Sequence, residues 1–161
     1  MIRGIHHVAI STGDIDRLIA FYRDVMGFEF VRESSWAAGS ELVDAIVGLR
    51  GSSARSAKLK LGNGYLELFQ YLTPEGAPQD PNRPVNDHGY THFCVDVVDI
   101  DAEYERLSAA GMVFHCPPPP ATTTGPGAQR STYGRDPDGN VIELQELNPQ
   151  HPLSIFPSSG D

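Results

Sequence analysis

The chain has 161 residues, of which 40% are hydrophobic and 20% charged, a size and composition typical of a globular protein with a buried core. Its net charge of −9 argues against a nucleic-acid partner, which would need a basic stripe to neutralise phosphates. There is no apolar run of about eighteen residues and no apolar leader with a basic start, so no membrane partner is expected and a cytoplasmic location is predicted. Cys94 and Cys116 are too few for a disulfide framework.

The sequence contains an internal repeat. Residues 4–16 align without a gap to residues 89–101, an offset of 85, and residues 62–68 resemble residues 138–144. In both copies a histidine and a glutamate fall at matching places. The matching residues are His7 with His92 and Glu67 with Glu143.

In chain order, the first half is predicted to be βαβββ. Alternating and helical spacings of apolar residues predict a strand, a helix and then three strands. The predicted ranges are 5–11 for the first strand, 14–27 for the helix, and 28–32, 57–61 and 65–71 for the later strands. Gly62-Asn63-Gly64 predicts a hairpin turn. The spacing of apolar residues in 40–49 indicates a short additional helix.

The second half is predicted to repeat the same order. The predicted ranges are 90–97 for the first strand, 100–110 for the helix, and 112–115, 129–133 and 140–146 for the later strands. Residues 136–139, Asp-Pro-Asp-Gly, are typical of a turn. The proline-rich stretch 117–127 indicates a surface connection rather than a proline-recognition ligand.

The period of two in a β-strand predicts which way the repeated side chains point. His7 is out of phase with Val8 and Ile10, and the other three repeated residues are flanked by apolar neighbours in the same way. All four therefore lie opposite the face that the helices cover. Taken singly, a strand histidine is more often structural and a strand glutamate more often exposed. Their recurrence favours a shared site instead.

Two imidazoles and two carboxylates make a mixed nitrogen and oxygen site that suits a divalent metal such as Zn, Ni, Co, Mn or Fe. The predicted metal ligands are His7, Glu67, His92 and Glu143. The fold class predicted is therefore α+β, with two tandem βαβββ modules forming a curved mixed sheet around a metal cleft. The predicted segments are a first module at 1–71, a linker at 72–88, a second module at 89–147 and a tail at 148–161, which either docks or frays.

Further side chains are candidates for contact with a substrate. The candidates are Trp36, Asp44, Phe69, Arg130 and Tyr133. Phe69 shares the face of Glu67, Cys94 shares that of His92, and Gln145 shares that of Glu143. An arginine such as Arg130 suits an anionic group of a substrate. The alternatives are that Phe69 fills the core, that Trp36 and Asp44 belong to an ordinary surface helix, and that Arg130 is solvated.

Several segments together carry a resemblance to a known family. Residues 7–10, 14–16 and 21–28, together with residues 135–144, resemble the vicinal oxygen chelate superfamily. That superfamily includes glyoxalase I, methylmalonyl-CoA epimerase, extradiol dioxygenases, and fosfomycin and bleomycin resistance proteins. The resemblance covers residues 4–147, and its motifs are specific for the fold but much less so for the reaction.

The resemblance implies the same four metal ligands, in a set similar to that of bacterial glyoxalase I, although epimerases of the family commonly have Gln where Glu67 stands. It implies a metal-dependent lyase or isomerase that chelates two oxygens of a small oxo- or hydroxy-acid derivative and stabilises an enolate or enediolate. Glu67 and Glu143 are the predicted catalytic bases, with a metal-bound hydroxide as the alternative. It also implies a homodimer, with the site within one chain or shared.

Two other functions stay open at this point. An extradiol-type dioxygenase needs Fe(II) held by two histidines and one carboxylate, which His7, His92 and Glu143 would supply. Glu67 would then be surplus. A metal-free small-molecule-binding protein of the bleomycin-resistance kind is the other alternative, although it would have no need for four such side chains on one face.

Overall fold

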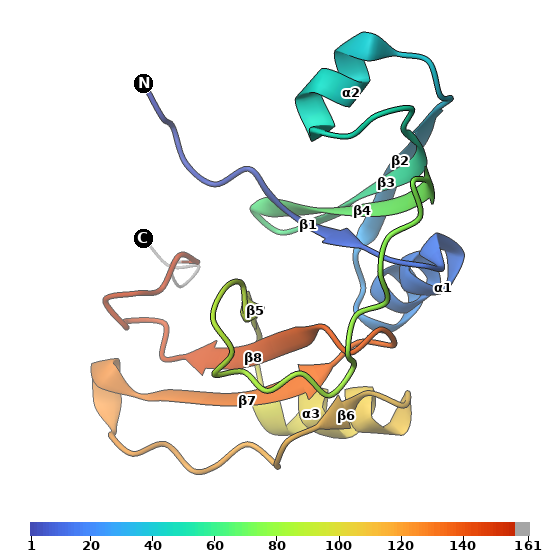
Figure 1. Cartoon of the computed structure of the whole chain (residues 1–161). Coiled ribbons are helices and arrows are strands. Elements are labelled where there is room, and N and C mark those ends of the chain that lie inside the picture. Colours follow the sequence, from blue (N-terminus) through green and yellow to red (C-terminus); the bar gives the residue numbers. More distant parts are fainter. Residues whose placement is uncertain (157–161) are drawn as a thin grey trace. The chain divides into compact units, whose positions relative to one another are not determined.

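The computed structural model describes residues 1–156 (Figure 1). The chain divides into two compact units, Met1–Asp80 and Pro81–Asp161, and the boundary lies inside the predicted linker at 72–88. Of the predicted tail at 148–161, residues 157–161 lie outside the described part. No helix between residues 1 and 156 has the length and apolar character needed to cross a membrane.

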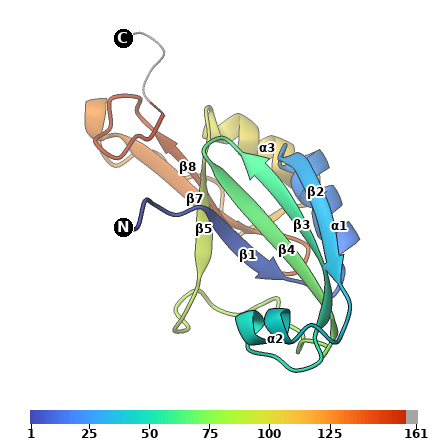
Figure 2. The ribbon, with the colours of Figure 1, turned by 90° about the horizontal axis from the view of Figure 1, so that it is seen from above.

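The first unit contains one four-stranded mixed sheet. Its elements are β1 His7–Ser11, α1 Ile15–Ala20, η1 Phe21–Val25, β2 Glu29–Trp36, α2 Glu41–Val47, β3 Ser53–Leu61 and β4 Gly64–Thr73. The strands lie in the order β1-β4-β3-β2, as Figure 2 shows, with β1 parallel to β4 and the other pairs antiparallel.

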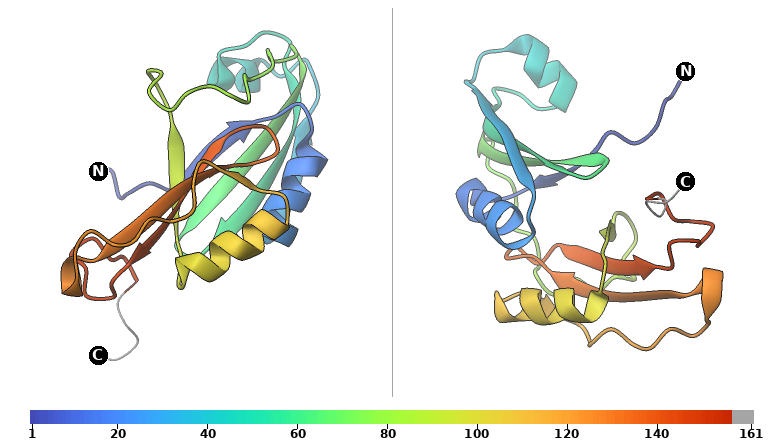
Figure 3. Two further views of the ribbon diagram at one scale, coloured as in Figure 1. Left: turned by 90° about the horizontal axis from the view of Figure 1, so that it is seen from below. Right: turned by 180° about the vertical axis from the view of Figure 1, so that it is seen from behind.

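The second unit repeats this arrangement. Its elements are β5 His92–Asp96, α3 Ile100–Ala109, β6 Val113–Phe114, η2 Gly125–Gly127, β7 Gln129–Arg135 and β8 Val141–Leu147. The strand order is β5-β8-β7-β6, again with the first strand parallel to the last. Helix α3 runs along one face of this sheet (Figure 3). The predicted α+β fold with two tandem βαβββ modules is confirmed.

Helices α1 and α3 each start at an aspartate that both copies of the repeat contain. Asp14 Oδ1 accepts a hydrogen bond from the Arg17 amide at 3.1 Å, and Asp99 Oδ1 accepts one from the Ala102 amide at 3.1 Å. An oxygen at this position satisfies an amide that the first helical turn leaves without a partner. The repeated aspartates therefore place both helices at the same point after the first strand.

The apolar residues that flank the repeated glutamates form the core of each unit. In β4, Leu66 and Leu68 are buried, and in β8, Ile142 and Leu144 are buried. Helix α1 packs on β3 and β4, and α3 packs on β8. Burying such side chains is the main favourable term in folding. The repeated histidines and glutamates lie on the opposite face of each sheet.

Several element boundaries differ from the prediction, and β3 starts at Ser53 rather than at residue 57. The helix expected at 14–27 changes after Ala20 into a π-helical turn, in which the Met26 amide donates to the Phe21 carbonyl at 3.0 Å. Strand β2 extends beyond the predicted 28–32, because Trp36 still pairs with Ala54 of β3. Trp36 therefore ends a strand rather than lying on a surface helix. The additional helix expected within 40–49 is α2.

Candidate metal centre

The structure brings the repeated histidine and glutamate together inside each unit. His7 Nε2, from β1, lies 3.1 Å from Glu67 Oε2, from the neighbouring strand β4. His92 Nε2, from β5, lies 3.1 Å from Glu143 Oε2, from β8. The two glutamate side chains are 18% and 15% exposed. Both units thus present the same nitrogen and oxygen pair at the same separation.

This separation fits two ligands of one metal ion. Donors that lie about 2.1 Å from a cation, at right angles to each other, are about 3 Å apart. A neutral imidazole and a carboxylate are also ligands that first-row divalent metals accept. Each pair by itself therefore has the donor types and the spacing to supply two neighbouring positions of a metal's coordination sphere.

In each unit Nδ1, the other ring nitrogen of the histidine, contacts the side chain of the preceding residue. His7 Nδ1 lies 2.9 Å from His6 Nδ1, and His92 Nδ1 lies 2.9 Å from Thr91 Oγ1. His6 is in turn held against Tyr65, with ring centroids 5.0 Å apart. A hydrogen bond at one ring nitrogen orients the other, so Nε2 is left facing the glutamate.

The cross-strand neighbours of the two glutamates differ between the units. Lys58 is opposite Glu67, and its Nζ lies 3.3 Å from Glu67 Oε1. Tyr133 is opposite Glu143. Lys58 was not among the site residues predicted from the sequence. The predicted hairpin turn could have identified it, because the pairing of β3 with β4 across that turn places residues 58 and 67 opposite each other.

Tyr133, a predicted substrate contact, lies on the candidate site of the second unit. Its ring centroid is 4.8 Å from that of His92. Burial, followed by the nearby carboxylate of Glu143, raises the pKa of the Tyr133 phenol above its ordinary value. The phenol therefore stays protonated near neutral pH, as a hydrogen-bond donor.

Phe69 and Trp36 lie together on the face of Glu67. Phe69 follows Glu67 by two positions in β4, and its ring centroid is 6.1 Å from that of Trp36 and 5.9 Å from that of Tyr71. Trp36 Nε1 donates to Ser52 Oγ at 3.1 Å. The rings of Trp36, Phe69 and Tyr71 together form an aromatic cluster. It places an apolar surface on the face of the first sheet that carries Glu67.

Asp44, another predicted contact, is fully engaged in holding the loop after α2. Its carboxylate accepts hydrogen bonds from the Gly51 amide at 2.6 Å, the Ser52 amide at 2.8 Å and the Ser52 hydroxyl at 2.6 Å. These donors, the Ser52 hydroxyl first, lower the pKa of the Asp44 carboxyl. We therefore leave Asp44 out of the proposed site.

Arg130 lies on the other face of its sheet. It is opposite Glu146, in phase with the buried Leu144, and so faces away from Glu143. Its guanidinium binds Asp101 and donates to the carbonyls of Pro118 and Pro119. The expected contact with a substrate beside the ligands does not fit this placement, and Arg130 is also left out.

Each unit by itself supplies two of the four predicted ligands. Within residues 1–156 there is no group of three or more His, Cys, Asp or Glu side chains arranged to hold a metal ion. A four-ligand centre requires both pairs at once. The combined set of His7, Glu67, His92 and Glu143 stays a prediction, and the two pairs are what the structure contributes to it.

The chain belongs to the Glyoxalase/Bleomycin resistance protein/Dioxygenase superfamily, whose family profile matches residues 4–144. It is 34% identical over 151 residues to a 2-epi-5-epi-valiolone epimerase from an Actinomyces species, covering 89% of this chain and 79% of that protein. A probable lactoylglutathione lyase from Vibrio cholerae is 26% identical to this chain, and the match covers 91% of this chain and 93% of that protein.

A solved structure has the same fold. The crystal structure of a glyoxalase family protein from Bacillus cereus superposes with a TM-score of 0.77, at 23% identity, over 91% of this chain and 95% of that one. This likeness concerns the fold alone. The predicted membership in the family is confirmed, and named relatives of the chain include enzymes that act on small molecules.

Proposed function

We propose that this protein is a divalent-metal-dependent enzyme of the epimerase, isomerase or lyase kind. It would move a proton at a carbon next to a carbonyl in a small hydroxy- or oxo-compound. The observation that carries the proposal is the histidine and glutamate pair that each unit presents, with the two donor atoms 3.1 Å apart in both. An epimerase and a lyase among the named relatives support the same class of reaction.

The four residues that would hold the metal are His7, Glu67, His92 and Glu143. A bound divalent ion would act as a Lewis acid for the negative charge that forms on oxygen when the proton leaves. The contacts of Nδ1 with His6 and Thr91 would keep the two imidazoles oriented. Glu67 or Glu143, once detached from the metal, would take up and return the proton, because a carboxylate held on a cation is too weak a base.

Metal analysis of the purified protein tests the proposed centre. Protein prepared without a chelator should carry close to one divalent ion per chain, and Glu67→Ala and Glu143→Ala should each lose most of it. Glu29→Ala removes an exposed carboxylate from the same sheet as Glu67 and should retain the metal. A wild-type protein that binds none of Zn, Ni, Co, Mn or Fe would point to a metal-free binding protein instead.

Solvent exchange tests the proposed reaction. In D2O, the loaded enzyme should introduce deuterium next to the carbonyl of an accepted substrate. A small oxo- or hydroxy-acid is the first compound to try, and the neutral 2-epi-5-epi-valiolone is the second. Replacing a catalytic carboxylate by its amide should slow this exchange by about 10²–10⁴-fold. Iron retention with oxygen-dependent ring cleavage of a catechol, without exchange, would favour the dioxygenase.

A further inference from the structure

The metal side of the first sheet also carries the only two lysines in the chain, Lys58 and Lys60, both on β3. Lys58 is opposite Glu67 on β4 and opposite Arg32 on β2. Residues directly opposite in an antiparallel pair share a face. Strand β2 has a bulge between Phe30 and Arg32. The face on which the side chains after the bulge lie therefore has to be established separately.

The next cross-strand pair supplies that check. Ser34 follows Arg32 by two positions, and Ser56 precedes Lys58 by two. Ser34 Oγ lies 2.9 Å from Ser56 Oγ, so these two side chains are on one face. Arg32 and Lys58 are in phase with them. They therefore lie side by side on the face that carries Glu67.

An arginine directly opposite a lysine is unfavourable in a sheet, because like charges at this spacing repel. Lys58 is also mostly covered, with only 18% of its side chain exposed, and lysine is seldom buried unless it is paired. The carboxylate of Glu67 balances one of the two positive charges. One positive charge remains beside the proposed metal ligand.

We propose that Arg32 and Lys58 bind an anionic group of the substrate, a carboxylate or a phosphate. An arginine offers a planar fork that matches two oxygens, and a lysine adds a compact positive charge. The inference rests on the proposed function in one respect, because it assumes that the anionic group belongs to the substrate that the metal ligands bind. It narrows the substrate class to small oxo- or hydroxy-compounds that carry such a group.

The test uses sulfate and acetate as probes, because the first resembles a phosphate and the second is a carboxylate. Lysine-selective ¹⁵N labelling gives one backbone amide signal each for Lys58 and Lys60, so the position of binding can be read directly. The signal of Lys58 should move saturably on titration in both metal-free and zinc-loaded protein. Affinity is measured in parallel by calorimetry.

Arg32→Gln and Lys58→Met should weaken binding about tenfold or more, since a hydrogen bond to a charged group is lost. Lys60→Met is the matched control, because it removes the other lysine from the same strand and should leave the affinity unchanged. Arg32 is exposed, so Arg32→Gln should fold normally, and a thermal melt checks this. Saturation by sulfate alone assigns a phosphate, and saturation by acetate alone assigns a carboxylate.

The proposal is overturned if neither probe moves the Lys58 signal, or if Lys60→Met weakens binding as much as Lys58→Met. The latter result would indicate general attraction to the basic strand. The metal content of the same variants separates this inference from the proposed function. A protein that binds metal but neither anion refutes only the anion site, and one that binds an anion but never a metal refutes only the metal enzyme.

Discussion

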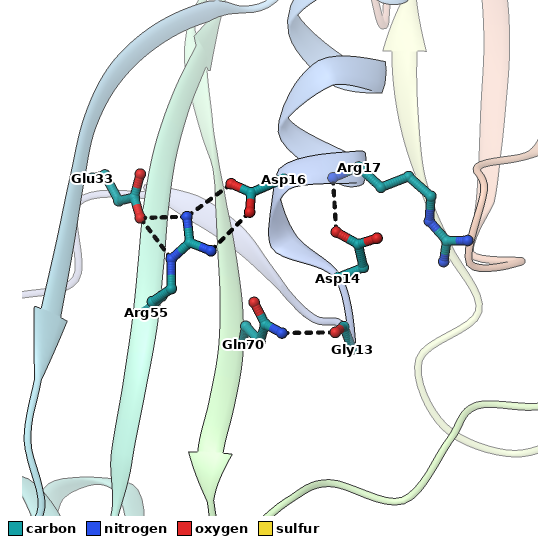
Figure 4. A network of polar contacts seen from close by, with 7 residues as sticks. All are labelled: Gly13, Asp14, Asp16, Arg17, Glu33, Arg55 and Gln70. Atoms are coloured by element: carbon teal, nitrogen blue, oxygen red, sulfur yellow. Dashed lines mark hydrogen bonds and ion pairs between the residues drawn. The ribbon is translucent and has the colours of Figure 1, made fainter.

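The guanidinium of Arg130 binds both carboxylate oxygens of Asp101 and so joins β7 to the first turn of α3. In the first unit, Arg55 holds Asp16 in the same way, joining β3 to α1, and it also binds Glu33 (Figure 4). The repeat therefore extends to the helix side of each sheet. Each module contains one histidine and glutamate pair on one face and one arginine and aspartate pair on the other.

This ion pair predicts a pH-dependent contribution to stability. The hydrogen bonds from Arg130 hold the pKa of the Asp101 carboxyl below its ordinary value. Since the folded pKa is lowered, the contribution is present above the unfolded value of about 3.9 and is lost as the pH falls through the folded pKa. Asp101→Asn should therefore melt at a lower temperature than the wild type at pH 7, with the difference shrinking as the pH falls below the unfolded value.

Asp16→Asn is the matched variant in the first unit, since Arg55 lowers the pKa of Asp16 in the same way. It should show the same trend with pH. A melting difference that stays constant from pH 7 to pH 2 in both variants would show that the ion pairs contribute nothing and that only the shape of the side chain matters.

The two histidine and glutamate pairs could be predicted from the sequence because strand periodicity and the repeat constrain the same residues. The phase of Glu67 against Leu66 and Leu68 determines the face, and the repeat supplies the partner strand. The roles of Arg130 and Asp44 could not be obtained in this way. Arg130 required the register of β7 against β8, which places it opposite Glu146. Asp44 required the path of the loop that brings Ser52 to it.

Backbone geometry was the other part that the pattern did not reveal. The π-helical turn at 21–25 has the same apolar spacing as an α-helix would have at that point, so periodicity does not separate them. The extension of β2 to Trp36 depends on its backbone pairing with β3, because Glu33, Ser34 and Ser35 carry no apolar alternation. The extension of β2 thus depends on its partner strand, whereas the π-helical turn is a backbone hydrogen-bond pattern that side-chain spacing does not encode.

The turn before β8 offers a test of close packing. Gly139 has a φ of +89°, and a Cβ there would lie 2.7 Å from the Pro81 carbonyl oxygen. Gly111, after α3, has a similar φ of +94° but open space around it. Gly111→Ala should cost about 1–2 kcal/mol of unfolding free energy from backbone strain alone. Gly139→Ala should cost more, because the Pro81 backbone must also shift.

Urea denaturation of the two variants measures this difference. Because both glycines have left-handed backbone, the excess in Gly139→Ala reports the contact with Pro81. Equal losses in the two variants would mean that residues around Pro81 yield freely, and that the segment does not pack against the turn.

Removing a ligand histidine and removing the residue before one should weaken metal binding to different degrees. His7→Ala should abolish tight binding in the proposed centre, because it removes a ligand. Thr91→Ala removes the group that holds His92 Nδ1 and should weaken affinity by about 10–100-fold without abolishing binding. Competition with a metal indicator measures both. Thr12→Ala, which alters a threonine next to β1, should leave the affinity unchanged, and a loss equal to that of Thr91→Ala would contradict an orienting role.

Ser52 links the aromatic cluster to the loop after α2. It is fully buried, donates to Asp44 Oδ1 at 2.6 Å and accepts from Trp36 Nε1 at 3.1 Å. Ser52→Ala leaves both partners without this hydroxyl, so it should cost about 1–3 kcal/mol of unfolding free energy. Trp36 is the only tryptophan in the chain, so its fluorescence reports both the unfolding and any change in its native surroundings.

Ser56→Ala is the control for this prediction, because it removes a hydroxyl of similar burial from the same sheet. Its hydrogen-bond partner Ser34 is exposed and can turn to water instead. The loss of stability should therefore be smaller, and the native emission of Trp36 should change less than in Ser52→Ala. If the two variants lose equal stability and leave the Trp36 spectrum unaltered, the hydrogen bonds through Ser52 do not hold the indole in place, because an indole set only by ring packing would behave in that way.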